Sequence, residues 1–168
     1  MKKILSVLLF LMAGCQPGGS EPVAGPTEQP RTAPAVQAVD QDGNPVNFSE
    51  FYARGPVVVY FYPKADTPGC TAQACSLRDS YEELTDKGVT VVGVSTDDAA
   101  AQKAFKAKHN LPFILIPDTQ GQVLEAFGVS KLGGFSTRQA FLIKDGKIVW
   151  HDSSASTSEQ AQDVLEQL

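Results

Sequence analysis

Few cysteines and basic residues occur in this sequence, and each shortage excludes a class of protein. Three cysteines among 168 residues cannot hold a disulfide-dense scaffold together, so the chain must bury a core of its own. With 42% hydrophobic and 20% charged residues, it has the composition of one ordinary globular domain. The 14 basic residues are scattered and are outnumbered by 19 acidic ones, so we expect no nucleic-acid partner.

The apolar run at the start of the chain, residues 4–12, is too short to cross a bilayer as a helix. Lys2 and Lys3 precede it, and two small residues and Cys15 follow, which is the order of a secretory signal over residues 1–14. The tetrad Met12-Ala13-Gly14-Cys15 resembles the bacterial lipobox. That resemblance implies lipidation of Cys15 and a place on the periplasmic side of a membrane in the cell envelope. A simple signal peptide with an incidental cysteine is the alternative.

A stretch rich in Pro, Gly, Glu and Gln follows Cys15 and extends to residue 34. Such a composition cannot bury enough apolar surface to offset its ordering entropy, so residues 15–34 are expected to form a disordered linker. With Cys15 assigned to the anchor, Cys70 and Cys75 remain. In an exported protein, this pair could be structural, metal-binding or redox-active.

Residues 35–168 alternate between strand and helix patterns and are expected to form one domain. An unbroken apolar run at 56–62 predicts a central strand buried on both faces, and residues 89–94 are expected to form a second buried strand. Further strands are expected at 113–116, 140–143 and 148–150, and a β-hairpin at 36–39 and 46–48. Helices are expected from Cys70 to Leu84, from a Ser95-x-x-Asp98 capping box to His109, at 122–127, and after a Thr157-x-x-Gln160 cap. This order predicts an α/β thioredoxin-like fold, with a mixed central sheet flanked by helices and an N-terminal β-hairpin.

The strongest chemical signal lies where the first central strand leads into its helix. Cys70 falls in the first turn of that helix, beyond the carboxyl end of a strand, where ligands bind in open α/β sheets. The unpaired N–H groups of a first helical turn favour a negative charge, so a thiolate is stabilised there. Thr67 can place a hydroxyl beside the sulfur. Pro68 fits the first turn because its missing N–H is not needed, and Pro63 stiffens the loop.

The spacing Pro63-x-x-x-Thr67-x-x-Cys70 resembles the active-site motif of the peroxiredoxins, and the continuation through Cys75 to Asp79 resembles their bacterioferritin-comigratory-protein, or Q-type, subfamily. The resemblance covers about residues 36–150. It implies a thiol peroxidase that reduces hydrogen peroxide and organic hydroperoxides. Cys70 is then the peroxidatic nucleophile and Cys75 the resolving cysteine, which forms a disulfide with it.

The same resemblance implies that Arg138, which precedes a later strand, contacts the peroxidatic sulfur. Thr67, Arg138 and the helix amides would polarise the peroxide bond, as preorganised donors do. It further implies a thioredoxin-like dithiol protein as the reductant and a monomer or weak dimer. Neither a cofactor nor a metal is required.

The spacing of the two cysteines adds a physical constraint. Residues five apart on a continuous helix have Cα atoms about 8–9 Å apart, whereas a disulfide needs less than about 7 Å. Cys70 and Cys75 also point in different directions around the helix. The bond therefore requires the first turns to unwind in every catalytic cycle.

Two other functions fit an exported thioredoxin-like domain with a cysteine pair. Disulfide reductases of this fold use Cys-x-x-Cys, whereas this chain has four residues between its cysteines. Copper chaperones of the Sco type use Cys-x-x-x-Cys with a distant histidine, for which His109 and His151 are the candidates here. Both histidines are better explained as surface residues, His109 because it ends a helix, where an imidazole complements the dipole.

Replacement of Cys15 tests the expected lipid anchor. In a bacterial host the full-length protein should sediment with membranes, and Cys15→Ala should release it because no acyl chain can be attached. Immunoblots of the membrane and soluble fractions measure this. An equal distribution of the two forms would indicate a plain signal peptide.

Overall fold

The computed structural model describes residues 31–168. The signal sequence expected over residues 1–14, Cys15 and most of the expected linker lie outside the described residues. The linker was expected to end at residue 34, but Arg31–Thr32 already forms strand β1, which pairs antiparallel with β10. Ala33 is 6% exposed, so the folded domain begins before residue 35.

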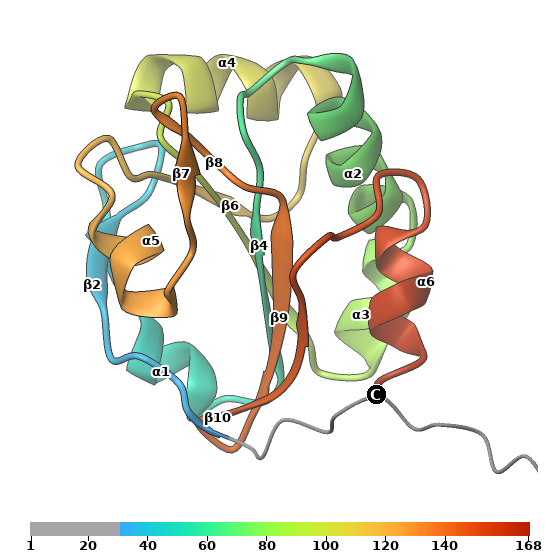
Figure 1. Ribbon diagram of the computed structural model, residues 1–168. Helices are drawn as coiled ribbons and strands as arrows, with labels where there is room; N and C mark the ends of the chain where they lie inside the picture. The colour runs from blue at the N-terminus through green and yellow to red at the C-terminus, as the bar shows by residue number, and fades with distance from the viewer. Residues whose placement is uncertain (1–30) are drawn as a thin grey trace, which may run out of the picture.

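A six-stranded mixed sheet in the order β1-β10-β9-β4-β5-β6 forms the centre of the domain (Figure 1). Strands β4, β5 and β6 are parallel, while β9 and β10 run antiparallel to their neighbours, as the sequence predicted. Their bounds are β4 Val57–Phe61, β5 Thr90–Ser95, β6 Ile114–Pro117, β9 Gln139–Lys144 and β10 Lys147–Asp152. All five residues of β4 are buried, because the sheet is covered on both faces.

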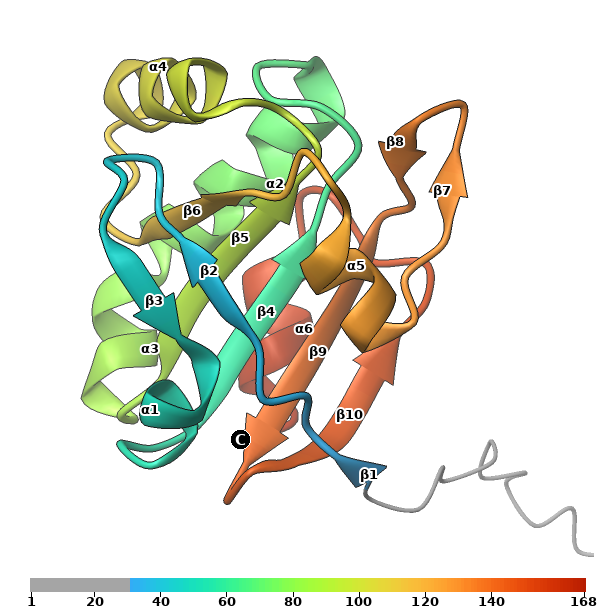
Figure 2. The same cartoon turned by 90° about the vertical axis from the view of Figure 1, so that its left-hand side faces the viewer.

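Successive residues of β4 point to opposite faces and divide the core in two. Val58 and Tyr60 pack with helices α2, α3, α4 and α6, whereas Val57 and Val59 pack with α1, α5 and the β2–β3 hairpin (Figure 2). The helices are α1 Phe48–Tyr52, α2 Pro68–Asp79, α3 Tyr81–Asp86, α4 Ala99–His109, α5 Gln122–Phe127 and α6 Gln160–Leu165. The hairpin consists of β2 Gln37–Val39 and β3 Pro45–Asn47.

The helix expected from Cys70 to Leu84 is two helices. Ser80 has φ −102° and ψ 13°, which separates α2 from α3. Serine favours helix ends because its side chain competes for backbone hydrogen bonds. Three residues at helical spacing along this stretch, Cys70, Leu77 and Leu84, are nevertheless all buried in the same core.

Both predicted capping boxes were wrong. Helix α4 is capped by Asp98, whose carboxylate accepts from the N–H of Ala101 at 2.8 Å, while Ser95 ends β5. Helix α6 follows Glu159, without a side-chain cap, and Gln160 is fully buried instead of facing the solvent. The expected strand at 46–48 also ends one residue earlier, because Phe48 begins α1.

None of the helices in the described part of the chain is long and apolar enough to cross a membrane.

Candidate active site

The loop between β4 and α2 is fixed at several points. Thr67 Oγ1 donates to the carbonyl oxygen of Lys64 at 2.9 Å, so its proton points back into the loop. The N–H of Ala65 donates to Asp97 Oδ2 at 2.7 Å, which ties the loop to the end of β5. These bonds hold the chain in place immediately before the helix that carries Cys70.

Asp66 anchors the same loop to the last turn of α4. Its carboxylate lies 2.6 Å from Lys108 Nζ and 2.8 Å from His109 Nε2. Asp66 has φ 59°, in the left-handed region that aspartate tolerates better than most residues. The hydrogen bonds from His109 and Lys108 hold the pKa of Asp66 below its usual value. The loop is thus fastened by an ion pair that needs the ionised carboxylate.

Cys70 lies in the first turn of α2 and is 1% exposed. Arg138, the residue before β9, directs Nη2 to the sulfur at a distance of 3.4 Å. A side chain on Gly69 would place its Cβ 3.2 Å from the same Nη2, so glycine leaves room for the guanidinium. The thiol therefore lies between the positive end of a helix and a permanent cation, both of which stabilise a thiolate.

Arg138 is itself held by a buried amide that the sequence analysis did not single out. Its Nη1 donates to Gln73 Oε1, and Gln73 Nε2 donates to Gln160 Oε1 at 2.7 Å. Both glutamines are fully buried. Gln73 follows Cys70 by three residues, a helical spacing that places both side chains on one face. Nothing in the sequence near Gln160 indicates its contact with a residue 87 positions earlier.

Cys75 lies on the same continuous helix as Cys70, is partly exposed, and both thiols are free. The intact α2 agrees with the geometric constraint, because an unbroken helix keeps residues five apart beyond disulfide reach. Beyond Cys75, Arg78 Nη1 donates to the backbone oxygen of His109 at 2.9 Å and fastens α2 to the end of α4. Of the two cysteines, Cys75 is the one that a solution partner can reach.

A groove opens beside Arg138. Residues 131–136 form a small hairpin, β7 Lys131–Leu132 and β8 Phe135–Ser136, that projects from the domain (Figure 2). Its apolar side chains are exposed, Leu132 by 78% and Phe135 by 42%. The groove is lined by Pro63, Leu132, Phe135, Ser136, Thr137, Arg138, Ser153, Ser154 and Ala155. Two of the sequence-predicted site residues, Pro63 and Arg138, thus share one surface.

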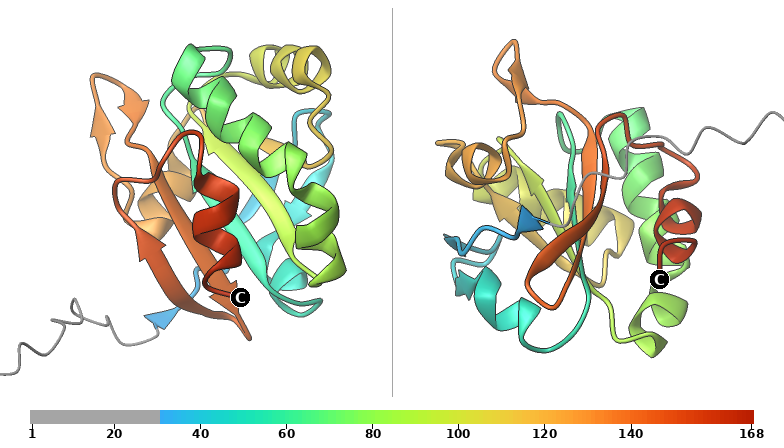
Figure 3. Two further views of the ribbon diagram at one scale, coloured as in Figure 1. Left: turned by 90° about the vertical axis from the view of Figure 1, so that its right-hand side faces the viewer. Right: turned by 60° about the horizontal axis from the view of Figure 1, so that its bottom comes forward.

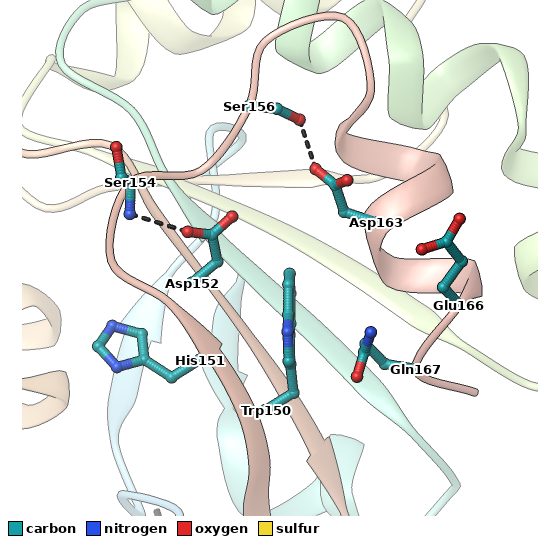
Figure 4. Close-up of a pocket in the computed structure, with 8 residues that line it drawn as sticks. All are labelled: Trp150, His151, Asp152, Ser154, Ser156, Asp163, Glu166 and Gln167. Atoms are coloured by element: carbon teal, nitrogen blue, oxygen red, sulfur yellow. Dashed lines mark hydrogen bonds between the residues drawn. The ribbon is translucent and has the colours of Figure 1, made fainter. Parts of the chain in front are cut away.

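A second pocket lies between β10 and α6 (Figure 4). It is lined by Trp150, His151, Asp152, Ser154, Ser156, Asp163, Glu166 and Gln167. Ser156 Oγ donates to Asp163 Oδ2 at 2.5 Å, and the N–H of Ser154 donates to Asp152 Oδ1 at 2.9 Å (Figure 4). Its lining shares Ser154 with the groove but includes neither Pro63 nor Arg138.

The two histidines considered as copper ligands contact other side chains. His109 is paired with Asp66, and His151 stacks on Phe141 with ring centroids 4.2 Å apart. Across residues 31–168, no three His, Cys, Asp or Glu side chains gather so that they could hold a metal ion. The copper-chaperone alternative therefore lacks a ligand set in this part of the chain.

Fold and site together define a thioredoxin-like protein with a buried, cation-paired thiol at the start of a helix. The sequence profile of the AhpC/TSA family matches residues 30–151. The chain belongs to this family, in its peroxiredoxin Q and Bcp branch. Peroxidoxin BcpB from Mycobacterium tuberculosis is 36% identical, with a TM-score of 0.77 over 82% of this chain and 93% of that structure.

Two curated relatives are similar in sequence. Chloroplastic peroxiredoxin Q of rice (Oryza sativa subsp. japonica) is 43% identical over 134 residues, 79% of this chain and 61% of the relative. Peroxiredoxin Bcp of Escherichia coli (strain K12) is 50% identical over 97 residues, 58% of this chain and 62% of the relative. The chain thus spans about three fifths of the length of these relatives.

The ion pair of Asp66 predicts a pH dependence. The pKa of this carboxyl is lower in the folded protein than in the unfolded chain, where it is about 3.9. Its contribution to stability is therefore complete above the unfolded value and is lost as the pH falls through the folded value. Asp66→Asn removes that contribution but retains tolerance of positive φ. The gap between the urea midpoints of the two proteins should be fully present above the unfolded value of about 3.9 and should narrow as the pH falls below it.

Asp145→Asn is the matched control, because Asp145 also has a positive φ, 51°, and makes no ion pair within the described residues. Its urea midpoint should track that of the unchanged protein at every pH. A gap for Asp66→Asn that does not vary with pH would contradict the ion pair.

Proposed function

We propose that this protein is a thiol-dependent peroxidase that reduces hydrogen peroxide and organic hydroperoxides at Cys70. One observation carries the proposal: the buried Cys70 sulfur lies at the start of α2, 3.4 Å from Arg138 Nη2. The start of the helix and the guanidinium both favour negative charge at this position, and the thiolate is the nucleophilic form of a cysteine. Membership of the AhpC/TSA family and similarity to proteins named peroxiredoxin Q support the assignment.

The reaction begins when the Cys70 thiolate attacks the terminal oxygen of the hydroperoxide. An S–O bond forms, the O–O bond breaks, and the leaving oxygen takes up a proton and departs as water or an alcohol. Cys70 becomes a sulfenic acid, so the sulfur is oxidised and the peroxide reduced by two electrons. Arg138 stabilises the thiolate first and then the negative charge that develops on the leaving oxygen.

Thr67 and Pro63 have supporting roles in this proposal. The Thr67 hydroxyl donates a hydrogen bond to the carbonyl oxygen of Lys64. It can rotate about its C–O bond and donate to a bound peroxide oxygen instead. Pro63 lines the groove beside Arg138 and limits the approach of water. Restricting water strengthens the electrostatic interactions at the sulfur because the local dielectric is lower.

Cys75 then resolves the intermediate. Its thiol condenses with the Cys70 sulfenic acid, water is released, and an intramolecular disulfide forms. Because α2 is continuous through both residues, its first turns must unwind for this step. A thioredoxin-like dithiol protein restores both thiols and is oxidised in exchange. The cycle uses no metal and no cofactor.

Location and assembly complete the proposal. A lipid at Cys15 would hold the protein on the periplasmic side of a bacterial membrane, where the domain acts as a monomer or weak dimer. Peroxides that enter the cell envelope would then be its substrates. The order of residues 1–15 supports this location.

Serine substitutions of the two cysteines test the chemistry. Cys70→Ser should abolish peroxide consumption, because a hydroxyl is not ionised at neutral pH and cannot attack the peroxide. Cys75→Ser should consume one equivalent of peroxide and stop as a sulfenic acid. Turnover of the unchanged protein and of Cys70→Ser is measured with a dithiol reductant in excess. The single equivalent consumed by Cys75→Ser is measured without reductant, and its stalled species by dimedone trapping and mass spectrometry. Multiple turnovers by Cys70→Ser would refute the assignment.

Amide hydrogen exchange tests the unwinding of α2. In the reduced protein, the amides of residues 71–79 should be protected like those of other helices. Oxidation by one equivalent of peroxide should raise their exchange sharply, because the disulfide cannot form on an intact helix, and a dithiol should restore protection. Helix α4 serves as the internal control, since it carries neither cysteine. Equal protection of α2 in the two redox states would rule out this route to the disulfide.

A further inference from the structure

The start of α6 is packed against the first turns of α2 (Figure 3). Ser76 Oγ accepts from the N–H of Ala161 at 3.0 Å, and Gln73 Nε2 donates to Gln160 Oε1 at 2.7 Å. A Cβ at Gly69 would lie 3.5 Å from the Thr157 methyl group. Residues 69, 73 and 76 are spaced by three or four, so one stripe of α2 carries all three contacts.

The hydrogen bonds that link Arg138 through Gln73 to Gln160 allow only one assignment of donors and acceptors. A guanidinium can only donate, so Gln73 must turn its oxygen to Arg138 and its NH2 to Gln160. Gln160 must in turn present its oxygen to Gln73. Its own Nε2 is left buried, with no hydrogen-bond partner among the described residues. An unpaired buried amide is destabilising, so this arrangement is kept at the expense of stability.

The turn that carries Gln160 is itself fastened. The hydroxyl of Ser156, ahead of α6, donates to Asp163 inside the helix (Figure 4). At the other end, Lys144 Nζ donates to the backbone oxygens of Gln167 and Leu168 at 2.9 and 3.1 Å. Helix α6 is thus fastened to the preceding loop near its start and to the end of β9 at its other end, and it provides a firm support for the amide that it presents to Gln73.

We propose that Gln160 is a positioning residue for the peroxidatic step, acting through Gln73 to keep Arg138 directed at the Cys70 sulfur. The inference rests on the proposed function, which it deepens by making the C-terminal helix part of the site. Both linking groups are neutral amides, so the positive charge of Arg138 is not cancelled by a carboxylate. That charge remains available to the thiolate and to the leaving oxygen.

Loss of the Gln160 oxygen would leave the NH2 group of Gln73 buried without a partner. The Gln73 side chain would then rotate to find another acceptor, and its oxygen would leave Arg138. The Arg138 guanidinium would lose its contact with Gln73, keep only that with the Cys70 sulfur, and adopt several orientations. The expected effect is on the rate of peroxide attack, not on the formation of the fold.

The test uses the Cys75→Ser protein, in which only the peroxidatic step occurs. Single-turnover oxidation of Cys70 by hydrogen peroxide is followed by quenching and mass spectrometry. Gln160→Met retains the length of the side chain but removes the acceptor, and should slow oxidation about tenfold. Gln162→Met, on the exposed side of the same helix, should leave the rate unchanged. Gln160→Glu restores an oxygen facing Gln73 and should recover most of the rate.

A double-mutant cycle separates positioning from structural damage. In an Arg138→Ala background, Gln160→Met should cause no further loss, because the residue that it orients is gone. Equal losses with and without Arg138, or no recovery with Gln160→Glu, would overturn the inference. If the unchanged protein reacts rapidly with peroxide and Gln160→Met reacts equally fast, the inference alone fails. If Cys70 of the Cys75→Ser protein is not oxidised by peroxide, the proposed function itself fails.

Discussion

The arrangement of the residues around the site depends on the contact between the buried Cys70 sulfur and the Arg138 guanidinium. Cys70 has almost no exposed surface, and an ionised group in such a place must be stabilised by nearby charges and donors. The N–H groups at the start of α2 provide one such source and Arg138 the other. Each requires accurate placement of a backbone segment, which explains why the loop before α2 and the residues behind Arg138 are so heavily fastened.

A rigid support and a helix that must open are combined in one domain. The sheet is buried on both faces, and the Asp66 ion pair fixes the loop against α4. Helix α2 packs Ala74 and Leu77 on the core, is joined to the start of α6 by single hydrogen bonds, and ends at the irregular Ser80. That break separates α2 from α3, so the first helix can lose its turns while Leu84 keeps α3 on the core. The division suits a cycle in which the nucleophile moves and the remainder of the fold stays.

The sequence was sufficient to predict features that depend on local pattern. The buried strand β4, the position of Cys70 at a helix start and the inner face of α2 all follow from the periodicity of apolar residues. Arg138 was found through a family motif. The Gln73–Gln160 bond was not predictable, because it joins segments 87 residues apart that tertiary packing brings together. The capping box at Ser95 failed for a similar reason: its hydroxyl bonds to Asp97 and Gln102 in a network that forms only after folding.

Strand β1 determines at which end of the sheet the chain enters the domain. Arg31 pairs with Ile148, Ile148 with Ile143, and Ile143 with Val57, the first residue of β4. Cys70, by contrast, follows the opposite end of β4, so the chain enters at one end of the sheet and the sulfur lies at the other (Figure 1). A protein partner can therefore approach the sulfur from the end of the sheet that lies away from the segment entering at β1.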